Sequence, residues 1–162
     1  MDTPDAINDL NSRDLAVRRR AAEQLATHPD VAAAVSLARA CGDADESVRE
    51  WAVAALEQLG VPDAADAAAL TELLADEHHD VRYWAATLLG RLGRQAASAA
   101  GPLGETVGRD PETAVRQRAA WALGEIGPAA AAVRSILAQA AASDDPRLAR
   151  LARQSLEKIA GS

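Results

Sequence analysis

The chain has 162 residues, enough for one domain with a hydrophobic core, and its composition favours helices over strands. Alanine accounts for 41 residues while phenylalanine is absent, and alanine is the best helix former but a poor strand former. The net charge of −7 argues against bulk binding to nucleic acid or to an anionic membrane. The most apolar run, residues 31–41, is too short to cross a bilayer, and the N-terminus has no secretory pattern, so we expect a cytoplasmic all-α protein.

Charge is unevenly distributed along the chain. Residues 1–81 carry −11, and residues 82–162 carry +4. Two interpretations stay open: chance distribution over a solvated surface, or an acidic end and a basic end that face different partners. A single cysteine, Cys41, excludes an intrachain disulfide and is expected to be a packing residue.

One segment recurs five times. The copies begin at Val17, Val48, Val81, Val115 and Leu148, with starts 31, 33, 34 and 33 residues apart. Such a period suits one helical hairpin per copy, stacked into a solenoid. We expect a single domain over residues 1–162, with repeats at about 3–28, 30–60, 62–93, 95–127 and 128–161.

The apolar residues of each copy fall on one helical face. If the opening residue is position zero, position four is always Ala and position eight always Leu, and position eleven is Leu or Ile except at His28. This spacing places them on one stripe of a helix, which predicts that each copy is the second helix of its hairpin. The stripe at positions four and eight is Ala21, Leu25, Ala52, Leu56, Ala85, Leu89, Ala119, Leu123, Ala152 and Leu156.

The segments before the copies read as the first helices of the hairpins, at residues 30–40, 63–75, 101–107 and 129–141. Pro102 is expected to separate a short turn from the main part of its helix. Glycines at the ends of the copies predict left-handed C-terminal caps, at Gly60, Gly93 and Gly127. Gly90 and Gly124 lie inside second helices, where a close neighbouring helix would justify them.

Two copies, the third and the fourth, read "DEHHDVRYWAATLLGRLG" and "DPETAVRQRAAWALGEIG". They share an initial acid, a Val-Arg pair, an Ala-Ala pair and the ending Leu-Gly-x-Leu/Ile-Gly. This pattern resembles the HEAT-like repeat of the phycobilin-lyase type. The resemblance implies a right-handed α-solenoid of about five hairpins, in a family that ranges from scaffolds to lyase subunits. The end copies depart from it: Ser12 stands in place of the acid and Ala149 in place of the arginine.

The resemblance also implies a polar ladder. Its arginines follow the opening residue, at Arg18, Arg49, Arg82 and Arg116, and its acids stand five residues before that residue, at Asp43, Asp76 and Asp110. Each arginine would bridge loop acids or carbonyls of adjacent repeats, because its planar fork can satisfy several acceptors. With Ser12 at the matching position, Arg18 is expected to be the weakest rung.

All four aromatic residues lie in second helices, which line the concave surface in HEAT-like solenoids. A helical wheel places Tyr83 and Trp121 on the open face, and Trp51 and Trp84 on the edge between core and groove. For the two edge tryptophans, a binding role and a stacked, gap-filling role both stay open. Aromatic residues and arginine are enriched at binding hot spots. The candidate partner-binding residues are therefore Tyr83, Trp121, Trp84, Trp51, Arg91, Arg118 and Arg94.

No motif for catalysis, metal or a cofactor accompanies these residues. The "DEHHD" stretch at 76–80 lacks the spacing of a zinc site. It predicts a solvated turn whose side chains cap the N-terminus of the following helix. We expect a monomeric, non-enzymatic interaction module that holds a protein or peptide on the concave surface. The resemblance leaves two alternatives: a nucleic-acid-binding protein of the alkylpurine glycosylase kind, and a phycobilin lyase subunit or chromophore chaperone.

Overall fold

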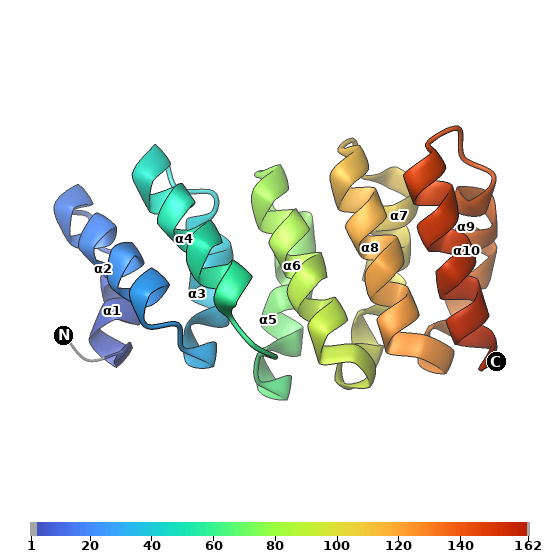
Figure 1. The fold of residues 1–162 in the computed structure, drawn as a ribbon, viewed down its shortest axis with the longest axis horizontal. Coiled ribbons are helices and arrows are strands. Elements are labelled where there is room, and N and C mark those ends of the chain that lie inside the picture. The colour runs from blue at the N-terminus through green and yellow to red at the C-terminus, as the bar shows by residue number, and fades with distance from the viewer. Residues whose placement is uncertain (1–2, 162) are drawn as a thin grey trace. The chain divides into compact units, whose positions relative to one another are not determined.

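A computed structural model describes residues 3–161, and within that range every regular element is helical. The chain divides into two compact units, one ending at Asp63 and the other beginning at Ala64 (Figure 1). We call them the N-terminal unit and the C-terminal unit and describe each by itself. The all-α class expected from the alanine-rich composition is confirmed.

The N-terminal unit holds two hairpins. The first pairs α1 with α2, and the second pairs α3 with α4, while α2 and α4 pack against each other. A short 3-10 turn, η1, leads into α3. The elements are α1 (Thr3–Asp9), α2 (Leu15–Thr27), η1 (Val31–Ala33), α3 (Ala34–Ala40) and α4 (Glu46–Gln58).

The C-terminal unit holds three hairpins. Its second helices α6, α8 and α10 lie side by side in one layer, and the first helices α5, α7 and α9 form the layer behind (Figure 1). Short 3-10 segments precede each first helix, and one more follows α5. The elements are η2 (Ala64–Asp66), α5 (Ala67–Glu72), η3 (Leu73–Ala75), α6 (His79–Leu92), η4 (Gly93–Ala99), α7 (Ala100–Arg109), α8 (Thr113–Ile126), η5 (Gly127–Val133), α9 (Arg134–Ala141) and α10 (Pro146–Ala160).

The predicted apolar stripe forms the core of both units. Every alanine at position four is fully buried, and so are the leucines at position eight except the last, Leu156, which is half-buried. Val17 is half-buried as well, and His28 is exposed. Full burial of one leucine side chain contributes about 2 kcal/mol, so the stripe supplies much of the stability of each unit. The exceptions lie in the first and last copies.

Of the three predicted left-handed caps, Gly93 and Gly127 share only the positive φ, because their ψ values of −127° and −141° lie outside the left-handed helical region. Gly93 and Gly127 end α6 and α8 with φ of 56° and 74°, a region in which residues with a side chain are strained. The prediction is wrong for Gly60, which has no positive φ. Helix α4 ends earlier, at Gln58, and Leu59 continues in extended conformation, so the chain needs no left-handed residue there.

The two glycines inside second helices mark close approaches, as predicted. A Cβ on Gly124 would lie 3.1 Å from the Cα of Ser155, because α10 crosses α8 closely at that point. A Cβ on Gly90 would lie 2.2 Å from the ring of Trp121. Gly90 therefore accommodates an aromatic side chain from α8.

Pro102 does not break its helix as expected. It lies in the first turn of α7, where a missing N–H costs no helical hydrogen bond. The departure from helical geometry comes earlier, at Ala96 in η4, with φ −96° and ψ 22°.

Candidate functional site

The arginine ladder joins consecutive hairpins within each unit. Arg18 donates from Nε to Oδ2 of Asp43 at 2.8 Å and from Nη1 to the carbonyl of Ser12 at 2.9 Å. Arg18 thus contacts both the backbone of its own turn and the carboxylate of the following hairpin. The hydrogen bond to Asp43 raises the pKa of Arg18, against an opposing effect of burial.

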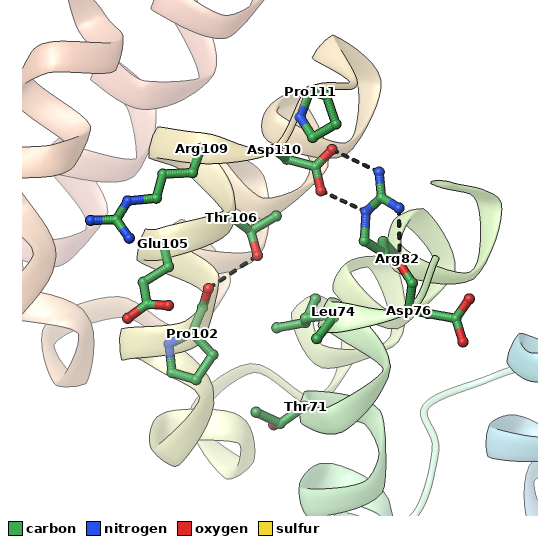
Figure 2. Close-up of a pocket in the computed structure, with 11 residues that line it drawn as sticks. Thr71, Leu74, Asp76, Arg82, Pro102, Glu105, Thr106, Arg109, Asp110 and Pro111 are labelled. Atoms are coloured by element: carbon green, nitrogen blue, oxygen red, sulfur yellow. Dashed lines mark hydrogen bonds and ion pairs between the residues drawn. The ribbon is translucent and has the colours of Figure 1, made fainter. Parts of the chain in front are cut away.

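The C-terminal unit repeats this geometry at Arg82, which donates to Oδ2 of Asp110 at 2.7 Å and to the carbonyl of Asp76 at 2.9 Å (Figure 2). The side chains of Arg82 and Asp110 are 11% and 5% exposed. Asp110 raises the pKa of the guanidinium through the hydrogen bond, although burial lowers it. The guanidinium therefore stays charged between two hairpins.

The expected register of the ladder was wrong. Arg18 is not the weakest rung, because the carboxylate that it binds belongs to the next copy rather than to its own. The fifth copy also lacks the acid, because Ser143 occupies the position, and Arg116 of the preceding copy donates instead to the carbonyl of Val107 at 2.9 Å. Arg49 donates to the carbonyl of Asp43 at 2.7 Å, inside the N-terminal unit.

A second set of contacts joins position two of one copy to the N-cap of the second helix in the next hairpin. Arg19 donates to Asp45, and Gln117 donates to Asp145 at 3.0 Å. The hydrogen bond from Arg19 is the main reason that the pKa of Asp45 is lowered to about 2. In copy three this position is occupied by Tyr83, which makes a different contact.

Tyr83 belongs to a cluster of rings and arginines on α6 and α8. Its ring meets that of Trp84 edge-on, with centroids 5.7 Å apart and planes at 86°. The guanidinium of Arg118 lies 4.9 Å from the Tyr83 centroid and 5.2 Å from the Trp121 centroid, and that of Arg91 lies 5.8 Å from the Trp84 centroid. We call these five residues the aromatic–arginine cluster. Cation–π attraction holds the arginines over the rings.

Arg118 is the centre of this cluster. Besides lying over two rings, it donates from Nη2 to the hydroxyl of Tyr83. Across the described part of the chain it forms no ion pair, unlike Arg18 and Arg82. The pKa of nearby Arg91 is lowered first by burial and then by the positive charge of Arg118. The two guanidinium groups therefore repel each other.

Trp121 is held by a notch in α6 and borders a small hollow. Its ring occupies the space left by Gly90, and the side chain is half-buried. Beside it lies a hollow of about 70 Å³. The lining comes from α8 and α10: Ala114, Gln117, Arg118, Trp121, Arg147 and Leu151.

Sequence reasoning had missed this hollow. The position of Gly90 inside a helix predicts the close approach of a neighbour but does not identify Trp121 as that neighbour. The sequence pattern does not predict a role for Arg147, because the fifth copy departs from the repeat and Arg147 matches no position that the copies share.

The remaining candidate residues differ in their surroundings. Trp84 is only 8% exposed, whereas Trp51, at the same position of its copy, is 40% exposed and lies in the N-terminal unit. Tyr83 and Arg91 cover the ring of Trp84. Arg94 is exposed in η4, and no described contact connects it with the cluster. The structure thus brings together five of the seven candidates.

A larger pocket of about 400 Å³ lies between α5 and α7 on the first-helix side (Figure 2). Part of its wall is the Arg82–Asp110 pair, and Thr106 donates to the carbonyl of Pro102 at 3.0 Å. Asp76, together with Glu105 and Arg109 on α7, supplies the other charges of the lining. The most buried charges of this pocket already satisfy each other, which leaves the cluster as the stronger candidate site.

The "DEHHD" turn is exposed at both histidines. Asp76 caps it by accepting from the backbone N–H of His78 at 2.9 Å, so the capping side chain is the aspartate. Among residues 3–161, no group of three or more His, Cys, Asp or Glu side chains is placed to hold a metal ion. In the same range, no helix is both long and apolar enough to cross a membrane.

The sequence matches the family of HEAT repeats over residues 3–80 and again over residues 67–157. The chain belongs to the HEAT repeat family. The two matches span nearly all five hairpins. None of the curated proteins matches this HEAT repeat chain significantly.

Three solved structures with a similar fold are engineered proteins. A designed armadillo repeat protein in complex with the peptide (KR)4 superposes with a TM-score of 0.69 at 19% identity, covering 99% of this chain and 82% of that one. Computationally designed armadillo repeat proteins for modular peptide recognition give 0.67 at 19% identity, with 99% and 83% covered. An engineered protein from the Northeast Structural Genomics Consortium gives 0.68 at 21% identity, with 99% and 81% covered. The α-solenoid class is thereby confirmed.

Proposed function

We propose that this HEAT repeat chain is a non-enzymatic interaction module that holds a peptide or protein segment against its second helices, at the aromatic–arginine cluster. The observation that carries the proposal is Arg118, stacked between the rings of Tyr83 and Trp121 and forming no ion pair with the described residues. Aromatic rings and arginine supply much of the binding energy at protein interfaces. Trp51 and Arg94 are additional proposed contacts, each argued from exposure alone.

Packing supports a preformed site. Trp121 rests in the notch at Gly90, and Tyr83 fixes Arg118 through its hydroxyl. Side chains ordered before binding lose little conformational entropy when a partner arrives. Solved relatives of this fold include proteins designed for peptide recognition, which is consistent with a peptide ligand.

Selection from a displayed library of random peptides of about twelve residues tests the proposal. The wild-type chain should enrich peptides that a Tyr83→Ala, Trp121→Ala variant no longer retains, while helical circular dichroism stays unchanged. The matched control is Val61→Ala, which removes an exposed apolar side chain (57% exposed) in the N-terminal unit. Equal retention by the double variant would show that the binding surface lies elsewhere.

Two other functions come from the resemblance to phycobilin-lyase-type HEAT proteins and to alkylpurine glycosylases. A lyase subunit or chromophore chaperone should change the visible absorption of a bilin on mixing. A nucleic-acid binder should retain DNA in a salt-sensitive manner. The arginines of the cluster are the feature that favours the second of these.

A further inference from the structure

The charge pattern of the cluster indicates what kind of peptide fits. Ladder arginines Arg18 and Arg82 each have a carboxylate within 2.8 Å, supplied by the next hairpin. For Arg118 the chain supplies two rings and a hydroxyl instead. Its Nε and Nη1 groups make no hydrogen bond within the described residues. A guanidinium fork with free N–H donors matches a carboxylate in geometry and charge.

A second arginine faces the same hollow. Arg147, at the start of α10, lines it together with Arg118 and Trp121, and its side chain is exposed. Asp145 forms no ion pair with either arginine in the described chain, and its carboxylate instead accepts from the N–H of Leu148 at 2.6 Å and from Gln117. The hollow therefore presents two positive charges beside an aromatic ring.

The size of the hollow points to the end of a side chain as its occupant. About 70 Å³ is well below the roughly 300–1,000 Å³ of small-molecule sites. A carboxylate on a longer peptide fits this space, while the peptide's remaining contacts would lie on the neighbouring rings.

We propose that Arg118 and Arg147 bind a carboxylate side chain of an acidic peptide segment, with Trp121 and Tyr83 packing against its apolar atoms. This inference rests on the proposed function and names the class of ligand. The repulsion between Arg91 and Arg118 adds to it, because a bound carboxylate would relieve that repulsion.

A peptide is favoured over nucleic acid by what surrounds the hollow. The helix starts on this face carry acids, Asp80, Glu112 and Asp145, and the whole sequence contains a single lysine, Lys158. A phosphate backbone needs a continuous row of cations, and these carboxylates would repel it. A single carboxylate side chain, by contrast, needs only the two arginines that line the hollow.

Fluorescence anisotropy with three labelled eight-residue peptides tests this assignment: (DE)4, the neutral (QN)4 and the basic (KR)4. We expect (DE)4 to bind more tightly than (QN)4 at about 150 mM salt and to weaken as salt rises. Arg118→Gln and Arg147→Gln should each lower the affinity for (DE)4 by about tenfold, the value of one charge-assisted contact. Arg134→Gln, the same charge change on α9, should leave it unchanged.

Several results would overturn the assignment. Equal binding of (DE)4 and (QN)4 would do so, as would full affinity in both arginine variants with normal circular dichroism. Tighter binding of a single-stranded DNA dodecamer through the same arginines would replace the peptide with nucleic acid. If library peptides depend on Tyr83 and Trp121 but show no preference for acidic residues, the proposed function stands and the acidic ligand is wrong.

Discussion

The junction between α6 and α8 contains two arginine environments with different partners. At one end, Arg82 is mostly buried and is paired with Asp110 and with backbone carbonyls. Along the same two helices, Arg118 lies on the rings of Tyr83 and Trp121, with no carboxylate from the described chain. The first arginine joins two hairpins through an ion pair, whereas the second contacts aromatic side chains and is the arginine that we propose as a binding residue. Residue type alone does not distinguish an arginine with a structural role from one that we propose for binding. The groups that each guanidinium contacts within the chain do distinguish them.

The N-terminal unit sharpens this contrast. There Arg18 pairs with Asp43 and Arg19 pairs with Asp45, so that positions one and two of the copy both serve the next hairpin. In copy three only position one pairs with a carboxylate of the next hairpin, because Tyr83 occupies position two and contacts Arg118 instead. The tyrosine redirects the junction from an ion pair to a cation–π contact.

The largest effect is expected from breaking the buried ladder pair. Asp110→Ala leaves the guanidinium of Arg82 without its carboxylate and should lower the free energy of unfolding by about 2–3 kcal/mol. Urea unfolding followed by circular dichroism measures this loss. Glu105→Ala, which removes an exposed acid from the same helix, should change stability by less than about 0.5 kcal/mol. If Asp110→Ala lowered the free energy of unfolding by as little as Glu105→Ala, the ion pair of Arg82 would stabilise the fold no more than the contacts of Arg118 do.

Gly90→Ala tests the notch beneath Trp121. The new methyl group would overlap the ring, which must move outward at a cost of about 1–3 kcal/mol. The higher helix propensity of alanine offsets about 1 kcal/mol of this cost, so we expect the free energy of unfolding to fall by about 1 kcal/mol. Because the ring moves outward, acrylamide should also quench the tryptophan fluorescence more strongly. Gly101→Ala is the matched control, since nothing lies within 4 Å of its new Cβ, and it should be neutral or stabilising. Unchanged quenching in Gly90→Ala would mean that the notch does not position the ring.

Tyr83→Phe removes the hydroxyl that accepts from Arg118 while keeping the ring beneath the guanidinium. We expect a loss of about 0.5–1 kcal/mol, less than for the ladder, because the contact is partly solvated. A double-mutant cycle with Arg118→Gln, measured by urea unfolding, should return a coupling energy of about the same size. Strict additivity of the two substitutions would show that the hydroxyl does not hold the arginine.

The smallest effect that we expect is the acid sensitivity of the Arg19–Asp45 pair in the N-terminal unit. The pKa of Asp45 is lowered from 3.8 to about 2, chiefly by the hydrogen bond from Arg19. Its contribution to stability is therefore complete above about pH 4 and is lost as the pH falls toward 2. Asp45→Asn lacks this contribution, so its stability deficit should shrink between pH 6 and pH 2.5 in urea titrations. A constant deficit over that range would place the effect in the helix cap alone. Tyr83→Phe should show no such narrowing.

Local pattern predicted the fold well because helix periodicity is a property of neighbouring residues. Ala85 and Leu89 are fully buried, as their positions in the copy required. The ladder was anticipated in residue type but not in register, since position within a copy does not say which hairpin supplies the carboxylate. Trp51 and Trp84 share a position and differ in exposure, because the residues covering Trp84 come from its own helix and were not part of the repeat pattern.

The amino-acid sequence by itself determined the helices, their repeat length, the Ala and Leu stripe that each one buries, and the family. Tertiary structure decided that Trp121 would rest on Gly90, that Arg118 would lie over two rings, and that Arg147 would meet it across a hollow. The physical reason is distance along the chain. Backbone hydrogen bonds and side-chain periodicity act over three or four residues, whereas these contacts join residues about thirty apart and depend on how closely two helices pack.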